Sequence, residues 1–109
     1  MELTGIPFGT TEWAGIEPTE HAGETGVAVW RTRHFGPLRV RMVEYSANYR
    51  ADHWCMKGHI VLCVAGDLRT ELSDGRVYSL RPGTSYQVAD GVDAHRSSSS
   101  AGATLFIVD

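Results

Sequence analysis

Residues 68–80 read Leu-Arg-Thr-Glu-Leu-Ser-Asp-Gly-Arg-Val-Tyr-Ser-Leu and give the clearest local indication of architecture in the chain. Two short segments, Leu68–Leu72 and Val77–Leu80, flank the polar residues 73–76. Asp-Gly between two such segments is a strong signal for a tight β-hairpin, because glycine adopts a positive φ without steric cost. The sequence therefore predicts an antiparallel hairpin at this point.

Similar short segments continue on both sides of this hairpin. From Gly26 onward, glycine, proline or aspartate interrupts the chain every five to nine residues, and helical periodicity is absent. Short strands at regular spacing are typical of a two-sheet jelly-roll barrel. We therefore predict an all-β jelly roll over 27–109, preceded by an irregular arm over 1–26 with one short edge strand. The nine predicted strands are 27–33, 38–46, 50–56, 59–65, 68–72, 77–80, 84–88, 94–97 and 104–108.

Length and composition limit the classes of protein that fit. The chain has 109 residues, enough for one domain, and its 42% apolar and 21% charged residues are typical of a globular protein. A net charge of −3 predicts no basic face for nucleic acid. The longest apolar run, 60–65, is too short to cross a bilayer, and the first residues lack a signal-peptide pattern. We expect a cytoplasmic protein with no membrane association.

Three histidines and a cysteine are the candidate metal ligands. If the predicted strands on either side of Lys57 form a hairpin, Cys55 lies roughly opposite His59, and His53 shares the face of Cys55. His95 could then complete the site from a neighbouring strand. Imidazole and thiolate groups that converge in this way bind divalent transition metals. The alternative is a polar or empty barrel mouth.

A disulfide between the two cysteines is not expected. In the same hairpin Cys63 would lie opposite residue 51, four residues along from Cys55. At about 3.3 Å per residue that is roughly 13 Å, too far for a disulfide. Cys63 lies within an apolar run and is predicted to be a small buried hydrophobic residue.

The stretch 47–66 resembles the first motif of the cupin superfamily, G-x5-H-x-H-x3,4-E-x6-G. His53 stands at the first histidine, Cys55 at the second, His59 at the glutamate and Gly66 at the closing glycine, while Ala47 replaces the opening glycine. The better-known cupins bind iron, manganese, nickel or zinc through three histidines and one glutamate. The loss of the carboxylate weakens any direct transfer of their chemistry to this chain.

The second cupin motif, G-x5-P-x-G-x2-H-x3-N, is matched less closely. Gly83 and Gly91 fit it, His95 arrives one residue late, and Ser99 stands at the asparagine. Residues 52–55 read Asp-His-Trp-Cys, and with their surroundings they resemble the small single-domain cupins named for a DHCW motif. This resemblance implies a double-stranded β-helix barrel and no known activity. A metal held by His53, Cys55, His59 and His95 would be zinc or iron, because a thiolate favours these ions over manganese.

Two further positions are candidate substrate contacts. Gln87 has the parity to face inward if Ser85 does, and it would orient a ligand, whereas Tyr86 is expected in packing or on a dimer surface. Arg41 shares a strand face with Arg39, and the pair could form a wall that binds an anion. The alternative is that these arginines cover a solvated face.

These residues leave three functions open. The first is a metal-dependent enzyme, an oxygenase or isomerase acting on a small polar molecule. The second is a non-catalytic module that binds a small ligand or a metal and acts through a protein partner. The third is a metal-free barrel that serves only dimerisation. We expect a homodimer in each case, because three tryptophans and an apolar arm leave surface to bury.

Overall fold

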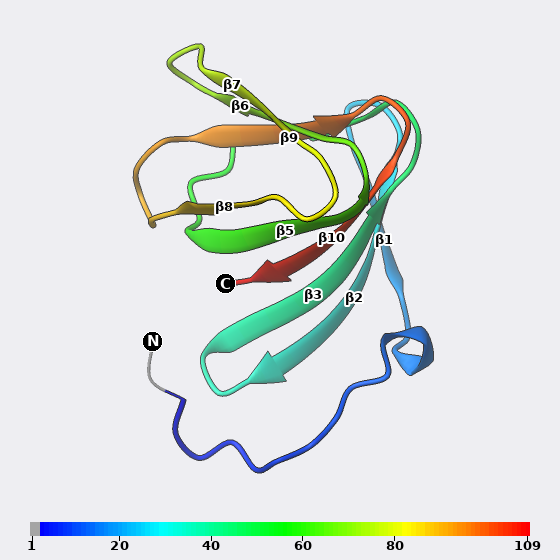
Figure 1. The fold of residues 1–109 in the computed structure, drawn as a ribbon, viewed down its shortest axis with the longest axis vertical. Helices are drawn as coiled ribbons and strands as arrows, with labels where there is room; N and C mark the ends of the chain where they lie inside the picture. The colour runs from blue at the N-terminus through cyan, green and yellow to red at the C-terminus, as the bar shows by residue number, and fades with distance from the viewer. Residues whose placement is uncertain (1–2) are drawn as a thin grey trace.

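Ten β-strands and one short 3-10 helix make up residues 3–109, the part of the chain that the computed structural model describes (Figure 1). The helix is η1 (Trp13–Gly15). The strands are β1 (Thr19–Ala22), β2 (Val27–Phe35), β3 (Leu38–Tyr45), β4 (Tyr49–Arg50), β5 (His59–Gly66), β6 (Leu68–Leu72), β7 (Val77–Leu80), β8 (Ser85–Val88), β9 (His95–Ser99) and β10 (Ala103–Val108).

The strands form two antiparallel sheets that face each other (Figure 1). The six-stranded sheet has the order β1-β2-β3-β10-β5-β8, and the four-stranded sheet has the order β4-β9-β6-β7. Some neighbouring strands are consecutive in the sequence, such as β2 and β3, whereas others come from distant parts of it, as when β10 lies between β3 and β5. The predicted all-β jelly-roll barrel is confirmed.

The core between the sheets follows from the alternation of side chains along each strand. On β10, Ala103, Leu105 and Ile107 are buried, whereas the residues between them are partly exposed. Residues two apart on a strand share a face, so this apolar row points to the barrel interior. Cys63 on β5 is fully buried within the core, as predicted, and both cysteines are free thiols.

The β6–β7 hairpin has the predicted bounds. Its turn is closed by the amide of Gly75 donating to Leu72 O and by the amide of Leu72 donating to Arg76 O. Gly75 has a φ of 98°, a conformation that strongly favours glycine. The Asp74 side chain accepts from the amide of Arg76 and fixes the turn from the side.

The predicted strand over 50–56 is wrong. Strand β4 ends at Arg50, and residues 51–58 form a loop apart from one isolated bridge between Cys55 and His95. The amide of each residue donates to the carbonyl of the other, over 2.7 and 3.0 Å. Cys55 is therefore opposite His95, and the expected hairpin with His59 does not form.

Residues 3–18, which precede β1, run along the outside of the six-stranded sheet (Figure 1). Trp13 packs edge-on against Phe106 of β10, and β1 pairs with β2 at the sheet edge. Among residues 3–109 no helix has the length and apolarity needed to span a membrane.

Candidate metal centre

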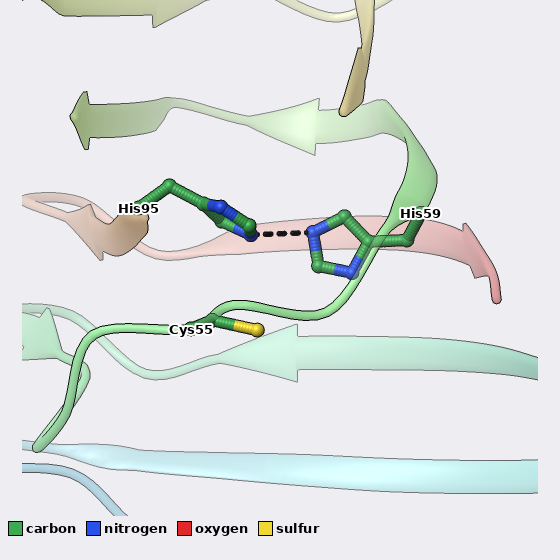
Figure 2. Close-up of side chains that lie close together, drawn as sticks. All are labelled: Cys55, His59 and His95. Carbon is green, nitrogen blue, oxygen red and sulfur yellow. Dashed lines mark hydrogen bonds between the residues drawn. The ribbon is translucent and has the colours of Figure 1, made fainter. Parts of the chain in front are cut away.

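Cys55, His59 and His95 come together inside the barrel (Figure 2). One nitrogen of each imidazole and the Cys55 Sγ all lie within 4.8 Å of one another. His59 begins β5 in one sheet, His95 begins β9 in the other, and Cys55 comes from the loop between β4 and β5. The cluster therefore forms where the two sheets and this loop meet.

Hydrogen bonding fixes the orientation of His95. Its Nδ1 lies 3.0 Å from the carbonyl oxygen of Asp93. A carbonyl can only accept, so Nδ1 carries the proton and Nε2 presents a lone pair to the cluster. Metal-binding histidines are commonly oriented by a second hydrogen bond of this kind. His95 is 2% exposed, which limits its alternative positions.

His59 is held neutral in a crowded site. Its Nε2 lies 2.9 Å from His95 Nε2 and 3.1 Å from the Tyr86 hydroxyl. Burial, and then the neighbouring His95, lower the pKa of His59 to about 4. The neutral imidazole is the form that binds metals. Because the two Nε2 atoms face each other, a proton or a cation must separate their lone pairs.

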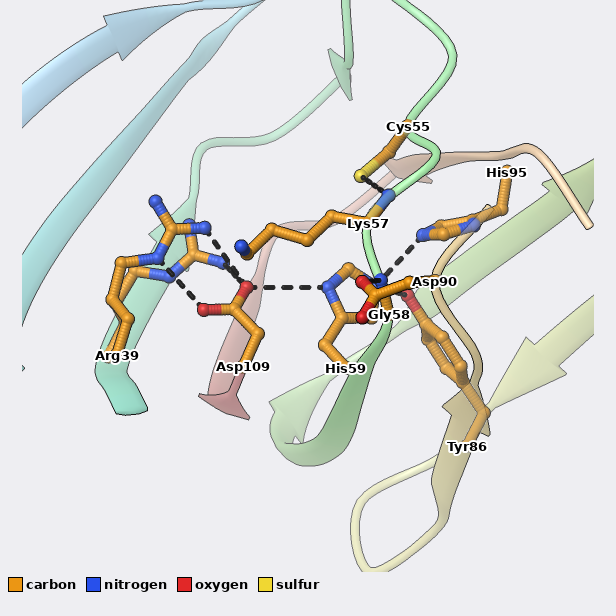
Figure 3. Close-up of polar contacts among 10 residues, drawn as sticks. Arg39, Cys55, Lys57, Gly58, His59, Tyr86, Asp90, His95 and Asp109 are labelled. Atoms are coloured by element: carbon orange, nitrogen blue, oxygen red, sulfur yellow. Dashed lines mark hydrogen bonds and ion pairs between the residues drawn. The ribbon is translucent and has the colours of Figure 1, made fainter. Parts of the chain in front are cut away.

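A buried carboxylate joins this cluster to a pair of arginines (Figure 3). The Asp109 side chain is inaccessible to solvent and accepts three 2.9 Å hydrogen bonds, two from Arg39 and one from Arg41. Its Oδ2 also lies 3.6 Å from His59 Nδ1, a buried nitrogen without a hydrogen-bond partner. Burial favours a raised pKa for Asp109, but hydrogen bonds from Arg39 and the charge of Arg41 outweigh it and hold the pKa low.

These groups line a cavity of about 450 Å³ that draws residues from both sheets. Trp30, Arg41 and Tyr86 come from the six-stranded sheet, and His95 and Arg96 come from the four-stranded sheet. The cavity is large enough for a small molecule.

The four predicted ligands are not all brought together. His53 lines the same cavity, but its side chain is 74% exposed and its Nδ1 lies 2.6 Å from Asp52 Oδ1. It is not part of the group formed by Cys55, His59 and His95, and the loop over 51–58 replaces the strand that was expected to align it with Cys55.

The two predicted substrate contacts differ in outcome. Arg41 is 5% exposed and lies in the cavity wall, so it does not cover a solvated face. Gln87 is exposed and does not line this cavity. The expected parity of β8 was inverted: Tyr86 pairs with the buried Val61 and turns its hydroxyl to His59.

Asp109 was missed by the sequence analysis, although the sequence held a signal for it. It continues the odd-numbered row of Ala103, Leu105 and Ile107, so its side chain falls on the inward face. The same parity applies to Arg39 and Arg41 on the neighbouring strand β3, where the amide of Arg39 donates to Asp109 O.

Comparison with solved structures identifies the fold. An RmlC-like cupin from Shewanella frigidimarina superposes with a TM-score of 0.78 at 13% identity, covering 94% of this chain and 90% of its own. Ectoine synthase from P. lautus gives 0.73 at 14% identity, covering 93% and 76%. A sugar phosphate isomerase from the cupin superfamily of Silicibacter pomeroyi gives 0.71 at 14% identity, covering 92% and 74%. No protein-family model and no curated protein sequence matched the chain.

The protein has the cupin fold, with a small-molecule-sized cavity inside the barrel. Its donor set of one thiol and two imidazoles is chemically suited to a divalent transition metal. The proton arrangement of His95 and the neutrality of His59 also fit such an ion.

Proposed function

We propose that the protein binds one divalent transition metal ion through Cys55, His59 and His95 and acts on a small polar molecule in the barrel. The observation that carries this proposal is the approach of His59 Nε2 and His95 Nε2 to 2.9 Å beside a free thiol. The thiol favours zinc or ferrous iron over harder ions. The ion would act as a Lewis acid or supply redox chemistry for an oxygenase- or isomerase-like reaction.

The residues around the cluster have separable tasks in this proposal. The carbonyl of Asp93 keeps the proton of His95 on Nδ1, so that its Nε2 stays free for a ligand role. The amide of Lys57 donates to Cys55 Sγ over 3.4 Å and would stabilise a thiolate there. The Tyr86 hydroxyl, 3.1 Å from His59 Nε2, is placed to donate to or accept from a bound molecule.

Elemental analysis tests the metal site directly. Protein purified without chelators and reconstituted with zinc or ferrous iron should hold close to one equivalent. The variants Cys55→Ser, His59→Gln and His95→Gln should each lose most of it. The matched control is His34→Gln, because His34 is exposed on β2 and does not line the cavity. Equal metal content in all five proteins, or none in the wild type, would contradict the proposal.

In this proposal His53 contacts the small molecule in the cavity and does not bind the metal ion. Its exposed imidazole lines the cavity mouth and is paired with Asp52. His53→Gln should therefore retain the metal. Loss of metal in this variant would show that His53 is a metal ligand, as the sequence predicted.

A second function, binding without catalysis, is favoured by one observation. Among residues 3–109, Asp109 is the only carboxylate that lines the cavity, and two arginines already engage it. A free carboxylate that could serve as a general base is thus not provided there. A metal-loaded protein that binds small ligands but converts none of them would support a sensing module that acts through a protein partner.

A further inference from the structure

The cavity is much more basic than the chain that forms it. Four cationic side chains and one carboxylate line it among the described residues, although the whole chain carries a net charge of −3. Arg96 is balanced from outside by Glu71 and Glu24, and it stacks on Trp54. The remaining excess of positive charge therefore belongs to one wall of the cavity.

That wall consists of Arg39, Arg41 and Lys57, with Asp109 between the two arginines. One buried carboxylate accepts from both guanidinium groups, so the pair keeps one positive charge in excess. Figure 3 shows the Lys57 side chain directed toward the same group, and the structure records no ion pair for it within residues 3–109. Lys57 is exposed and Arg39 is partly exposed, but Arg41 is buried, and a buried cation is costly unless an anion compensates it.

Arg41 is also incompletely hydrogen-bonded. Arg41 is 5% exposed, and its Nε is buried without a hydrogen-bond partner. The Trp30 ring lies under both groups, with guanidinium carbons 4.3 Å (Arg41) and 5.5 Å (Arg39) from its centroid. Stacking of this kind fixes the planes of the guanidinium groups and leaves N–H donors for another acceptor.

We infer that this wall binds the carboxylate of a small organic acid, whose remaining atoms extend to Cys55, His59 and His95. Planar guanidinium groups match a carboxylate in two-point hydrogen bonding, as they already do with Asp109. Asp109 Oδ2 lies 2.9 Å from Arg41 Nη2 and 3.6 Å from His59 Nδ1, so the wall and the cluster are adjacent. That this acid is the substrate rests on the proposed function, whereas its binding does not.

Calorimetric titration with acetate and malonate tests the inference, in both metal-free and zinc-loaded protein. Malonamide serves as the neutral control, and inorganic phosphate distinguishes a carboxylate site from a general oxyanion site. We expect saturable binding of malonate, at least tenfold weaker binding of phosphate, and none of malonamide. Binding of phosphate alone, or of no carboxylate to either form, would overturn the inference.

Three variants assign the binding to the wall. Arg39→Gln and Lys57→Gln retain the buried contact between Arg41 and Asp109, and each should weaken malonate binding about tenfold. Asp109→Asn should tighten it about tenfold, because it removes the one competing negative charge. Arg69→Gln is the matched control, since Arg69 is exposed on β6 and outside this cavity. Equal affinity in all of these proteins would refute the assignment.

The two proposals fail separately. Malonate binding without metal uptake would leave the anion wall intact and remove the metal centre. Metal uptake without carboxylate binding would retain the metal centre and exclude an organic acid as its partner.

Discussion

The single carboxylate of Asp109 pairs with two arginines, and the stability of the fold should depend more on Arg41 than on Arg39, because Arg41 is the more buried partner. Its side chain is 7% exposed, whereas that of Arg39 is 29% exposed. Removing the deeper partner leaves a fully buried carboxylate with fewer donors, which is a costly type of substitution.

We predict that Arg41→Met lowers the free energy of unfolding by about 2–3 kcal/mol. Denaturant unfolding followed by tryptophan fluorescence measures this change. Arg76→Met is the control, because Arg76 pairs with Asp74 at the exposed turn and should matter little. A larger loss in the Arg76 variant would contradict the importance assigned to the buried contact.

His59 should make the metal-free protein sensitive to mild acid. Its pKa is lowered to about 4 in the folded protein and is near 6.5 when the chain unfolds. Between these values the unfolded chain binds more protons, so stability should fall as the pH drops from 6.5 toward 4. Thermal midpoints measured with a chelator across this range test the effect.

The His59→Gln variant provides the comparison for this pH dependence. Glutamine does not titrate, so the slope between pH 6.5 and 4 should be shallower than in the wild type. Parallel slopes in the two proteins would show that another group is responsible. Asp109 contributes at lower pH, because its pKa is held below its usual value in the folded state.

At the scale of single residues, sequence parity predicted some positions and misjudged others. The shared face of Arg39 and Arg41 was identified correctly, and both side chains line the cavity. The orientation of Gln87 was not, because the parity of an isolated four-residue strand depends on its register with a neighbour. Here the pairing of Tyr86 with the buried Val61 sets that register.

At the scale of elements, two glycines with positive φ differ in what surrounds them. Gly75 has φ 98° in the β6–β7 turn, and a Cβ there would meet no atom within 4 Å. Gly66 has φ 80° at the end of β5, and a Cβ there would collide with the carbonyl oxygen of Gly102. The first position requires only a backbone conformation, whereas the second also requires space.

We therefore predict that Gly75→Ala costs about 1 kcal/mol and that Gly66→Ala costs about 3 kcal/mol or more. Chemical unfolding of both variants measures the difference. Equal losses would mean that the close approach between Gly66 and Gly102 relaxes without cost.

The elements that the sequence predicted well are those fixed by local chemistry. The strands on either side of Asp74-Gly75 have the predicted bounds, because that dipeptide specifies its own turn. The loop over 51–58 could not be foreseen in this way. The backbone of Cys55 pairs with His95, forty residues away in the chain, and no local pattern encodes such a partner.

At the scale of the whole molecule, the outer surface of β5 carries exposed apolar side chains. Ile60 is 50% exposed and Val64 is 44% exposed. We predict a homodimer in solution, with a light-scattering mass twice the 12.0 kDa of one chain. The double variant Ile60→Lys/Val64→Lys should be monomeric, because it places charge on this apolar surface. Val77→Lys, at an equally exposed valine of β7, is the control.

A monomeric wild type at low micromolar concentration would contradict this expectation. A dimer that persists in the double variant but not in the control would place the interface elsewhere on the molecule.

The position of the cluster has a mechanical consequence. His59 belongs to one sheet and His95 to the other, and the loop holding Cys55 is joined to β9 by the isolated Cys55–His95 bridge and by the amide of Ala51 donating to Ser97 O. An ion bound by these three side chains would cross-link the two sheets, as a disulfide cross-links distant segments of a chain. Chelation would then loosen the barrel along the seam between its sheets, so hydrogen exchange should accelerate first in β9 and in the loop over 51–58.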